Sequence, residues 1–128
     1  MSQQTPGKFC WNELISTDSG ASKQFYSNLF GWEVDDMDMG DFTYSMFKTP
    51  GAPDGPEGMA AGLMQAPMEG IPSHWLSYVL VEDVEATLEK AKSLGATVVK
   101  ETTELPMGTL AIFTDPQGAT FAIWKEKS

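Results

Sequence analysis

The second half of this 128-residue chain repeats the first half. The segment Leu14–Asp18 (LISTD) corresponds to Val79–Asp83 (VLVED), 65 residues further along the chain. In both copies the aspartate precedes apolar residues at helical spacing, which end at a glycine, Gly31 or Gly95. A repeat of this length predicts two half-domains that enclose one core, with a ligand site expected between them.

Each copy has the pattern of a strand, a helix and three further strands. Runs of aromatic and β-branched residues predict the strands, and Asp18 and Asp83 are typical N-caps of helices. We expect strands over 9–16, 32–36, 42–49 and 59–65 with a helix over 18–31, then strands over 73–81, 96–100, 108–114 and 119–124 with a helix over 83–95. A turn is expected at 39–41 and loops at 50–58 and 67–72. Because neither copy can close a core alone, we predict one α+β domain over 1–128, with module one at about 8–65 and module two at about 73–125.

The composition restricts the classes of partner. The chain is 41% hydrophobic and 20% charged, which is typical of a globular protein, and no apolar run is long enough for a membrane helix. A net charge of −10 disfavours nucleic acid and anionic membranes, which leaves small molecules or other proteins, although acidity can also serve solubility alone. The N-terminus lacks the pattern of a signal peptide and Cys10 is the single cysteine, so we expect a cytoplasmic protein.

An ordered set of motifs spans almost the whole chain. It runs from Thr17-Asp18 through Leu29-Phe30-Gly31-Trp32 and Val81-Glu82-Asp83-Val84-Glu85 to Asp115-Pro116-Gln117-Gly118. This set resembles the vicinal-oxygen-chelate superfamily of glyoxalase I, bleomycin-resistance proteins and extradiol dioxygenases. The segments 11–14 (WNEL) and 118–122 (GATFA) are similar to a glyoxalase-like subgroup. The resemblance implies two βαβββ modules whose eight strands form an open, cup-like barrel with helices outside, a cavity in the cup and, commonly, a dimer.

The same resemblance implies where a metal would be bound. Metal-using members take one His, Glu or Gln ligand from each of four strands, and the matching positions here are Trp11, Gly62, Leu76 and Ala122. None of these side chains can donate to a divalent cation. The chain has one histidine, so a two-histidine site is excluded. We therefore predict no metal and no other cofactor.

Strand alternation identifies the side chains that would face the cup. The set is mostly apolar and aromatic and comprises Trp11, Glu13, Met64, His74, Leu76, Tyr78 and Trp124. Such a lining suits a small apolar or planar organic molecule held by stacking and one or two hydrogen bonds. The alternative is that these aromatic side chains fill the barrel and leave no cavity.

Two polar members of this set have open alternatives. Glu13 lies in the middle of a strand, where an unpaired carboxylate would be costly, so it is either a ligand anchor or general base, or a hydrogen-bonded structural residue. His74 is either a polar ligand contact or an exposed histidine at a strand end.

The sequence thus predicts a metal-independent, glyoxalase-like protein that binds, and by binding sequesters, a toxic or antibiotic-like organic molecule. The first alternative is a metal-free lyase or isomerase that uses Glu13 as its general base. A second alternative is a degenerate domain that serves within a complex. Because each module leaves strand edges to be covered, we expect a homodimer.

Overall fold

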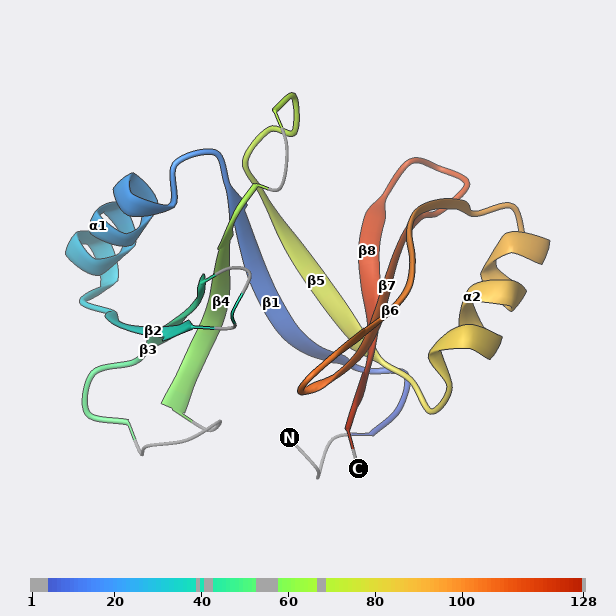
Figure 1. The fold of residues 1–128 in the computed structure, drawn as a ribbon, viewed down its shortest axis with the longest axis horizontal. Helices are drawn as coiled ribbons and strands as arrows, with labels where there is room; N and C mark the ends of the chain where they lie inside the picture. Colours follow the sequence, from blue (N-terminus) through green and yellow to red (C-terminus); the bar gives the residue numbers. More distant parts are fainter. Residues whose placement is uncertain (1–4, 39, 41–42, 53–57, 67–68, 128) are drawn as a thin grey trace. The chain divides into compact units, whose positions relative to one another are not determined.

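The computed structural model describes residues 5–38, 40, 43–52, 58–66 and 69–127. The ten elements follow the predicted order, one strand, one helix and three strands, twice (Figure 1). They are β1 (Phe9–Ser16), α1 (Ser19–Phe30), β2 (Glu33–Asp38), β3 (Thr43–Lys48), β4 (Met59–Gln65), β5 (His74–Leu80), α2 (Val84–Ser93), β6 (Thr97–Leu105), β7 (Gly108–Thr114) and β8 (Thr120–Glu126). The α+β class with two βαβββ modules and eight strands is confirmed. Most of the expected turn at 39–41 and parts of the loops at 50–58 and 67–72 lie outside the described residues.

The chain forms two compact units of similar internal connectivity. The first unit comprises residues 11–75, and the second comprises residues 1–10 together with 76–128. The described residues before β1 lie with the second unit, where the Gly7 N–H donates to the Leu80 carbonyl (2.7 Å) and the Leu80 N–H donates to the Lys8 carbonyl (2.9 Å).

Within the first unit the strands lie in the order β2-β3-β4-β1. β2, β3 and β4 pair antiparallel, and β1 pairs parallel to β4 with Glu13 opposite Gly62. The core on the α1 side consists of Leu14, Phe47, Ala61 and Leu63. Side chains that alternate along β1 and β4 therefore separate this apolar layer from the opposite face, which carries Glu13 and Gly62.

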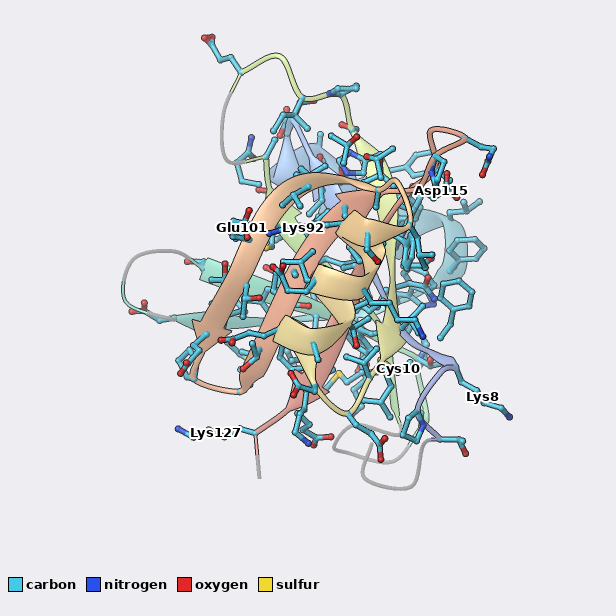
Figure 2. All side chains as sticks on the ribbon, turned by 90° about the vertical axis from the view of Figure 1, so that its right-hand side faces the viewer. Lys8, Cys10, Lys92, Glu101, Asp115 and Lys127 are labelled. Atoms are coloured by element: carbon cyan, nitrogen blue, oxygen red, sulfur yellow. The ribbon has the colours of Figure 1, made fainter. Side chains whose placement is uncertain are left out.

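The second unit repeats this plan with β6-β7-β8-β5, in which β5 pairs parallel to β8. Val84 and Leu88 of α2 pack on Ala111, Phe113 and Ile123. On the outer side of α2, Lys92 forms ion pairs with Glu89 (2.9 Å) and with Glu101 of β6 (3.6 Å, labelled in Figure 2). Such exposed pairs contribute little to stability.

Both helices begin in the same way. The Asp18 carboxylate accepts a hydrogen bond from the Ala21 N–H, and the Asp83 carboxylate accepts one from the Ala86 N–H, each at 3.0 Å. Capping of this kind satisfies a backbone donor that the helix itself leaves unpaired. α1 ends at Gly31, whose φ of 75° is the left-handed conformation favoured by glycine. The repeat seen in the sequence is thus a repeat of local geometry.

One expectation needs correction. β6 continues to Leu105, whereas the sequence predicted a strand ending at residue 100; its polar, Thr-rich end pairs with β7 through two register shifts. On α1, the side chains of Phe25 and Leu29 are 59% and 57% exposed. No helix of the described chain is long and apolar enough to cross a membrane.

Candidate functional site

A hydrogen-bonded cluster of three side chains lies on the face of the first unit opposite α1. The Trp11 indole N–H donates to the Tyr44 hydroxyl (2.9 Å). The Tyr44 hydroxyl is in turn hydrogen-bonded to the Glu13 carboxylate. Because a carboxylate can only accept, the chain of donors runs from Trp11 through Tyr44 to Glu13.

Strand register brings this cluster together. Trp11 and Glu13 are two residues apart on β1 and therefore share a face. β1 pairs with β4 at Gly62, and β4 pairs with β3, where Met46 is opposite Gly62. Tyr44 lies two residues before Met46 on β3, so its side chain projects from the same face and reaches back over Gly62.

Gly62 is required by this arrangement. A methyl group on this residue would overlap the hydroxyl of Tyr44 and would stand 3.1 Å from the Trp11 indole nitrogen. The absence of a side chain at residue 62 is therefore what allows the Tyr44 ring to lie across β4.

The cluster is shielded from solvent. Glu13 is 4% exposed and Tyr44 is 7% exposed, while Trp11 is half-buried. Burial raises the pKa of Tyr44, the negative charge of Glu13 raises it further, and the hydrogen bond from Trp11 opposes both effects. Tyr44 is thus a protonated hydroxyl at any physiological pH, and it holds the Glu13 carboxylate in a fixed orientation.

The other two predicted site residues of the first unit lie at strand ends. Met64 is on β4, two residues after Gly62, and is half-buried. His74 begins β5, and its Nδ1 lies 2.8 Å from the Pro72 carbonyl. Since a carbonyl only accepts, Nδ1 is the donor in this hydrogen bond. Their part in ligand contact stays a prediction.

Three further predicted residues belong to the second unit. Leu76 and Tyr78 are buried on β5, and Trp124 is half-buried on β8. The rings of Tyr78 and Trp124 meet edge to face with centroids 6.3 Å apart. The Trp124 ring also lies against Gly108 of β7, where a methyl group would overlap it. This unit therefore presents an aromatic pair above a glycine, and its role in ligand contact stays a prediction.

The four positions at which the resemblance implies metal ligands do not fit a metal centre. Ala122 and Leu76 are buried and apolar, Trp11 directs its N–H to Tyr44, and the space beside Gly62 holds the Tyr44 hydroxyl. Among the described residues, no group of three or more His, Cys, Asp or Glu side chains is arranged to hold a metal ion.

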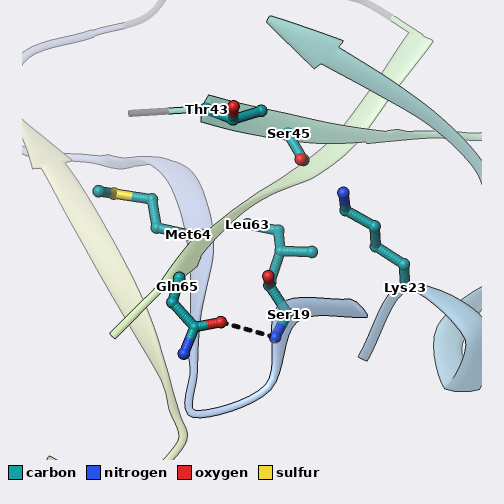
Figure 3. A pocket seen from close by; sticks show the side chains of 7 residues that line it. All are labelled: Ser19, Lys23, Thr43, Ser45, Leu63, Met64 and Gln65. Carbon is teal, nitrogen blue, oxygen red and sulfur yellow. Dashed lines mark hydrogen bonds between the residues drawn. The ribbon is translucent and has the colours of Figure 1, made fainter. Parts of the chain in front are cut away.

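A separate hollow of about 290 Å³ lies on the α1 side of the first unit (Figure 3). Its polar lining consists of Ser19, Lys23, Thr43, Ser45 and Gln65. Lys23 forms an ion pair with Asp36 (3.1 Å), which also accepts a hydrogen bond from Ser45 (2.6 Å). The Ser45 bond, and then Lys23, lowers the pKa of Asp36. The Gln65 side chain accepts a hydrogen bond from the Ser19 N–H and donates one to the Thr17 carbonyl. Gln65 therefore mainly holds the start of α1 against β4.

Tyr44 is a site residue that the sequence reasoning missed. Two signals were present in the sequence. Tyr44 is an aromatic residue between two small polar residues, Thr43 and Ser45, so on a strand it points to the opposite face from both of them. Residue 62, a predicted ligand position, is a glycine and leaves space for a neighbouring side chain. Only the register between β3 and β4 places Tyr44 over Gly62, and a single sequence does not reveal the register between two strands that are distant in the chain.

Comparison with solved structures identifies the fold. Methylmalonyl-CoA epimerase from Mycobacterium tuberculosis superposes with a TM-score of 0.64 at 13% identity, covering 100% of this chain and 93% of the other. The Mn(II)-bound glyoxalase from Novosphingobium aromaticivorans gives 0.61 at 20% identity, covering 94% of this chain and 39% of the other. At these identities the likeness concerns the fold alone.

Sequence comparison identifies closer relatives. The chain is 34% identical over 121 residues to CFP32 of Mycobacterium bovis, provisionally named a glyoxylase, covering 93% of this chain and 44% of the relative. It is 30% identical over 142 aligned positions to the anthracycline biosynthesis protein DnrV of Streptomyces peucetius, covering 98% and 50%. The chain thus spans about half the length of these relatives.

The family assignment rests on a further match. The sequence profile of the Glyoxalase/Bleomycin resistance protein/Dioxygenase superfamily matches residues 9–123, which is most of the chain. The match includes all of β1 and most of β8, so it takes in both modules. The chain belongs to the glyoxalase/bleomycin resistance protein/dioxygenase superfamily.

Proposed function

We propose that this protein binds a small, planar organic molecule without a metal, and that Glu13 anchors it. The observation that carries the proposal is the chain of hydrogen bonds from Trp11 through Tyr44 to Glu13. The hydrogen bond from Tyr44 orients a buried carboxylate on the face of the first unit that also carries Trp11 and Gly62. A pre-oriented carboxylate beside an indole ring offers one strong hydrogen-bond acceptor and one stacking surface.

The class of ligand follows from the site and from a relative. An acidic anchor in a chain of net charge −10 favours a ligand with an amine or another donor. The relative DnrV is named for anthracycline biosynthesis, and anthracyclines are planar, polycyclic and often carry an amino sugar. We therefore propose an anthracycline-like aromatic compound, which fits a role in sequestering an antibiotic.

Fluorescence titration with daunorubicin, a fluorescent anthracycline, tests this proposal. We expect saturable binding to the wild-type chain and binding about 10- to 100-fold weaker to Glu13→Gln, which keeps the shape and removes the charge. The matched control is Glu33→Gln, which removes an exposed carboxylate from β2 of the same unit. Equal affinities of the two variants would contradict Glu13 as the anchor, and non-saturable binding would contradict this ligand class.

One observation favours an enzymatic alternative. Glu13 is a buried carboxylate hydrogen-bonded to a hydroxyl whose pKa is raised, so a proton acceptor and a proton donor are adjacent. A metal-free lyase or isomerase would use Glu13 to remove a proton from carbon, a reaction class consistent with the glyoxylase name of the mycobacterial relative. This alternative would be supported if a substrate such as methylmalonyl-CoA exchanged a carbon-bound proton for solvent deuterium with the wild type and not with Glu13→Gln. Saturable binding without exchange supports the binding protein.

A further inference from the structure

Helix α1 carries an apolar stripe on the side that faces away from its own sheet. None of its twelve residues is buried. Residues on the sheet-facing side, such as Ser22 and Tyr26, are half-buried, whereas Ala21, Phe25 and Leu29 are exposed. These three residues are spaced at i, i+4 and i+8, which places them in one row along the helix. We call this row the α1 stripe.

Aromatic side chains extend the stripe onto the neighbouring surface. Phe30 is 55% exposed and Trp75 is 41% exposed. Both are in contact with Tyr26, which also meets Phe25 edge to face with centroids 5.0 Å apart. The exposed apolar surface is therefore continuous from Phe25 to Trp75.

This surface is large enough for the centre of an interface. An aromatic side chain has 150–250 Å² of surface, so three that are about half exposed, with Leu29, leave on the order of 400 Å² uncovered. A standard interface buries about 800 Å² on each partner, of which a polar rim is an ordinary part.

The second module provides an internal comparison. α2 occupies the corresponding place in the repeat, yet it buries Val84 and Leu88 and carries Glu85, Glu89, Lys90 and Lys92. α1 buries nothing and carries one charged residue, Lys23. The same element is therefore a solvated helix in one module and an apolar, nearly uncharged surface in the other.

Charge indicates which partner fits this surface. Each copy of the chain has 18 acidic and 8 basic residues, so two copies repel one another over most approaches. α1 has no acidic residue. Two of these acidic chains can therefore contact one another through α1 without bringing carboxylates of the two helices together.

We infer that two copies of this chain form a dimer through the α1 stripe. The row matches itself about a two-fold axis: two antiparallel α1 helices place Phe25 against Phe25 of the second copy, and the small Ala21 against Leu29. This is a contact between helix surfaces, distinct from the strand-edge pairing expected from the sequence alone.

Sedimentation velocity at tens of micromolar protein tests the inference. The wild type should sediment with roughly twice the 14.0 kDa mass of the chain. Phe25→Glu and Phe25→Lys should each be monomers, because like charges would face one another across the axis. An equimolar mixture of the two should regain the dimer, since opposite charges then meet. Restoration by mixing is specific to a contact in which residue 25 meets residue 25.

The matched control is Leu94→Glu, which places the same charge on a leucine 68% exposed at the end of α2. It should leave the dimer intact. Circular dichroism should show that all variants are folded, because Phe25 is exposed; Leu29→Lys is a second variant if Phe25→Glu unfolds. A monomeric wild type, or a dimer that survives both Phe25→Glu and Leu29→Lys, would overturn the inference. Ligand titration of the same samples is a separate readout, so the inference and the proposed function can fail independently.

Discussion

The hydroxyl of Tyr44 lies in the space into which any side chain at residue 62 would project, so Gly62 and Tyr44 are structurally dependent on one another. The resemblance to metal-using members implies a ligand at this position, whereas this chain has a glycine there, over which the Tyr44 hydroxyl lies. The tyrosine then links Trp11 to Glu13. Gly62 therefore makes room for the hydroxyl that joins this hydrogen-bond network.

The dependence of Tyr44 on Gly62 predicts that Gly62→Ala is destabilising. The added methyl group overlaps the Tyr44 hydroxyl, so the ring must move and the network is broken, at a cost of about 1–3 kcal/mol in the free energy of unfolding. Urea denaturation measures this change. Gly20→Ala in α1 is the control: its methyl group meets no atom closer than 3.7 Å, and alanine favours a helix. Equal stability of the two variants would contradict the dependence.

Removal of the Tyr44 hydroxyl alone should also destabilise the fold. Tyr44→Phe leaves the Trp11 N–H without its acceptor and Glu13 without this donor, which should lower the free energy of unfolding by about 1–3 kcal/mol. Tyr26→Phe is the matched control, because the Tyr26 hydroxyl accepts a longer, exposed bond from Trp75 (3.3 Å). We expect the control to cost under about 0.5 kcal/mol. Chemical denaturation measures the free energy of unfolding of both variants, and equal losses for Tyr44→Phe and Tyr26→Phe would contradict the prediction.

The raised pKa of Tyr44 predicts a specific loss of stability at alkaline pH. Above the ordinary tyrosine pKa of about 10 the unfolded chain releases this proton while the folded chain retains it, so stability falls as pH rises. Between pH 10 and the folded-state pKa, wild type should lose about 1.4 kcal/mol per pH unit more than Tyr44→Phe. Parallel stability curves for the two proteins over this range would show that Tyr44 is not shielded.

Metal independence is a further prediction. Because Trp11, Gly62, Leu76 and Ala122 offer no ligating side chain, elemental analysis of protein purified without an affinity tag should find no stoichiometric Zn, Ni, Fe or Mn. About one metal per chain, removed by a chelator together with ligand binding, would refute this prediction.

Much of the fold could be predicted because local signals agree with the final structure. β1 and β7 have the predicted bounds, and both helices start at the predicted aspartate caps. β6 was predicted too short because residues 101–104 are all polar, so this end lacks the hydrophobic alternation by which a strand is recognised in a sequence.

The site could be predicted only in part. Strand alternation correctly placed Trp11 and Glu13 on one face of β1, but the partner of Glu13 depends on the register of β3 against β4. The spacing of Phe25 and Leu29 predicted the helix and not its exposed side. An apolar row looks the same in a sequence whether it contacts the core or the surface.

The central claim is that Glu13, oriented by Tyr44, anchors a ligand in the absence of metal. Isothermal titration calorimetry of daunorubicin into protein treated with EDTA and dialysed tests it most directly, with wild type, Glu13→Gln and Tyr44→Phe compared under one set of conditions. The account predicts that EDTA leaves wild-type affinity unchanged. Glu13→Gln should then bind about 10- to 100-fold more weakly, and Tyr44→Phe should show an intermediate loss at a temperature where it remains folded. Binding that disappears with EDTA, or that is the same in wild type and Glu13→Gln, would contradict it.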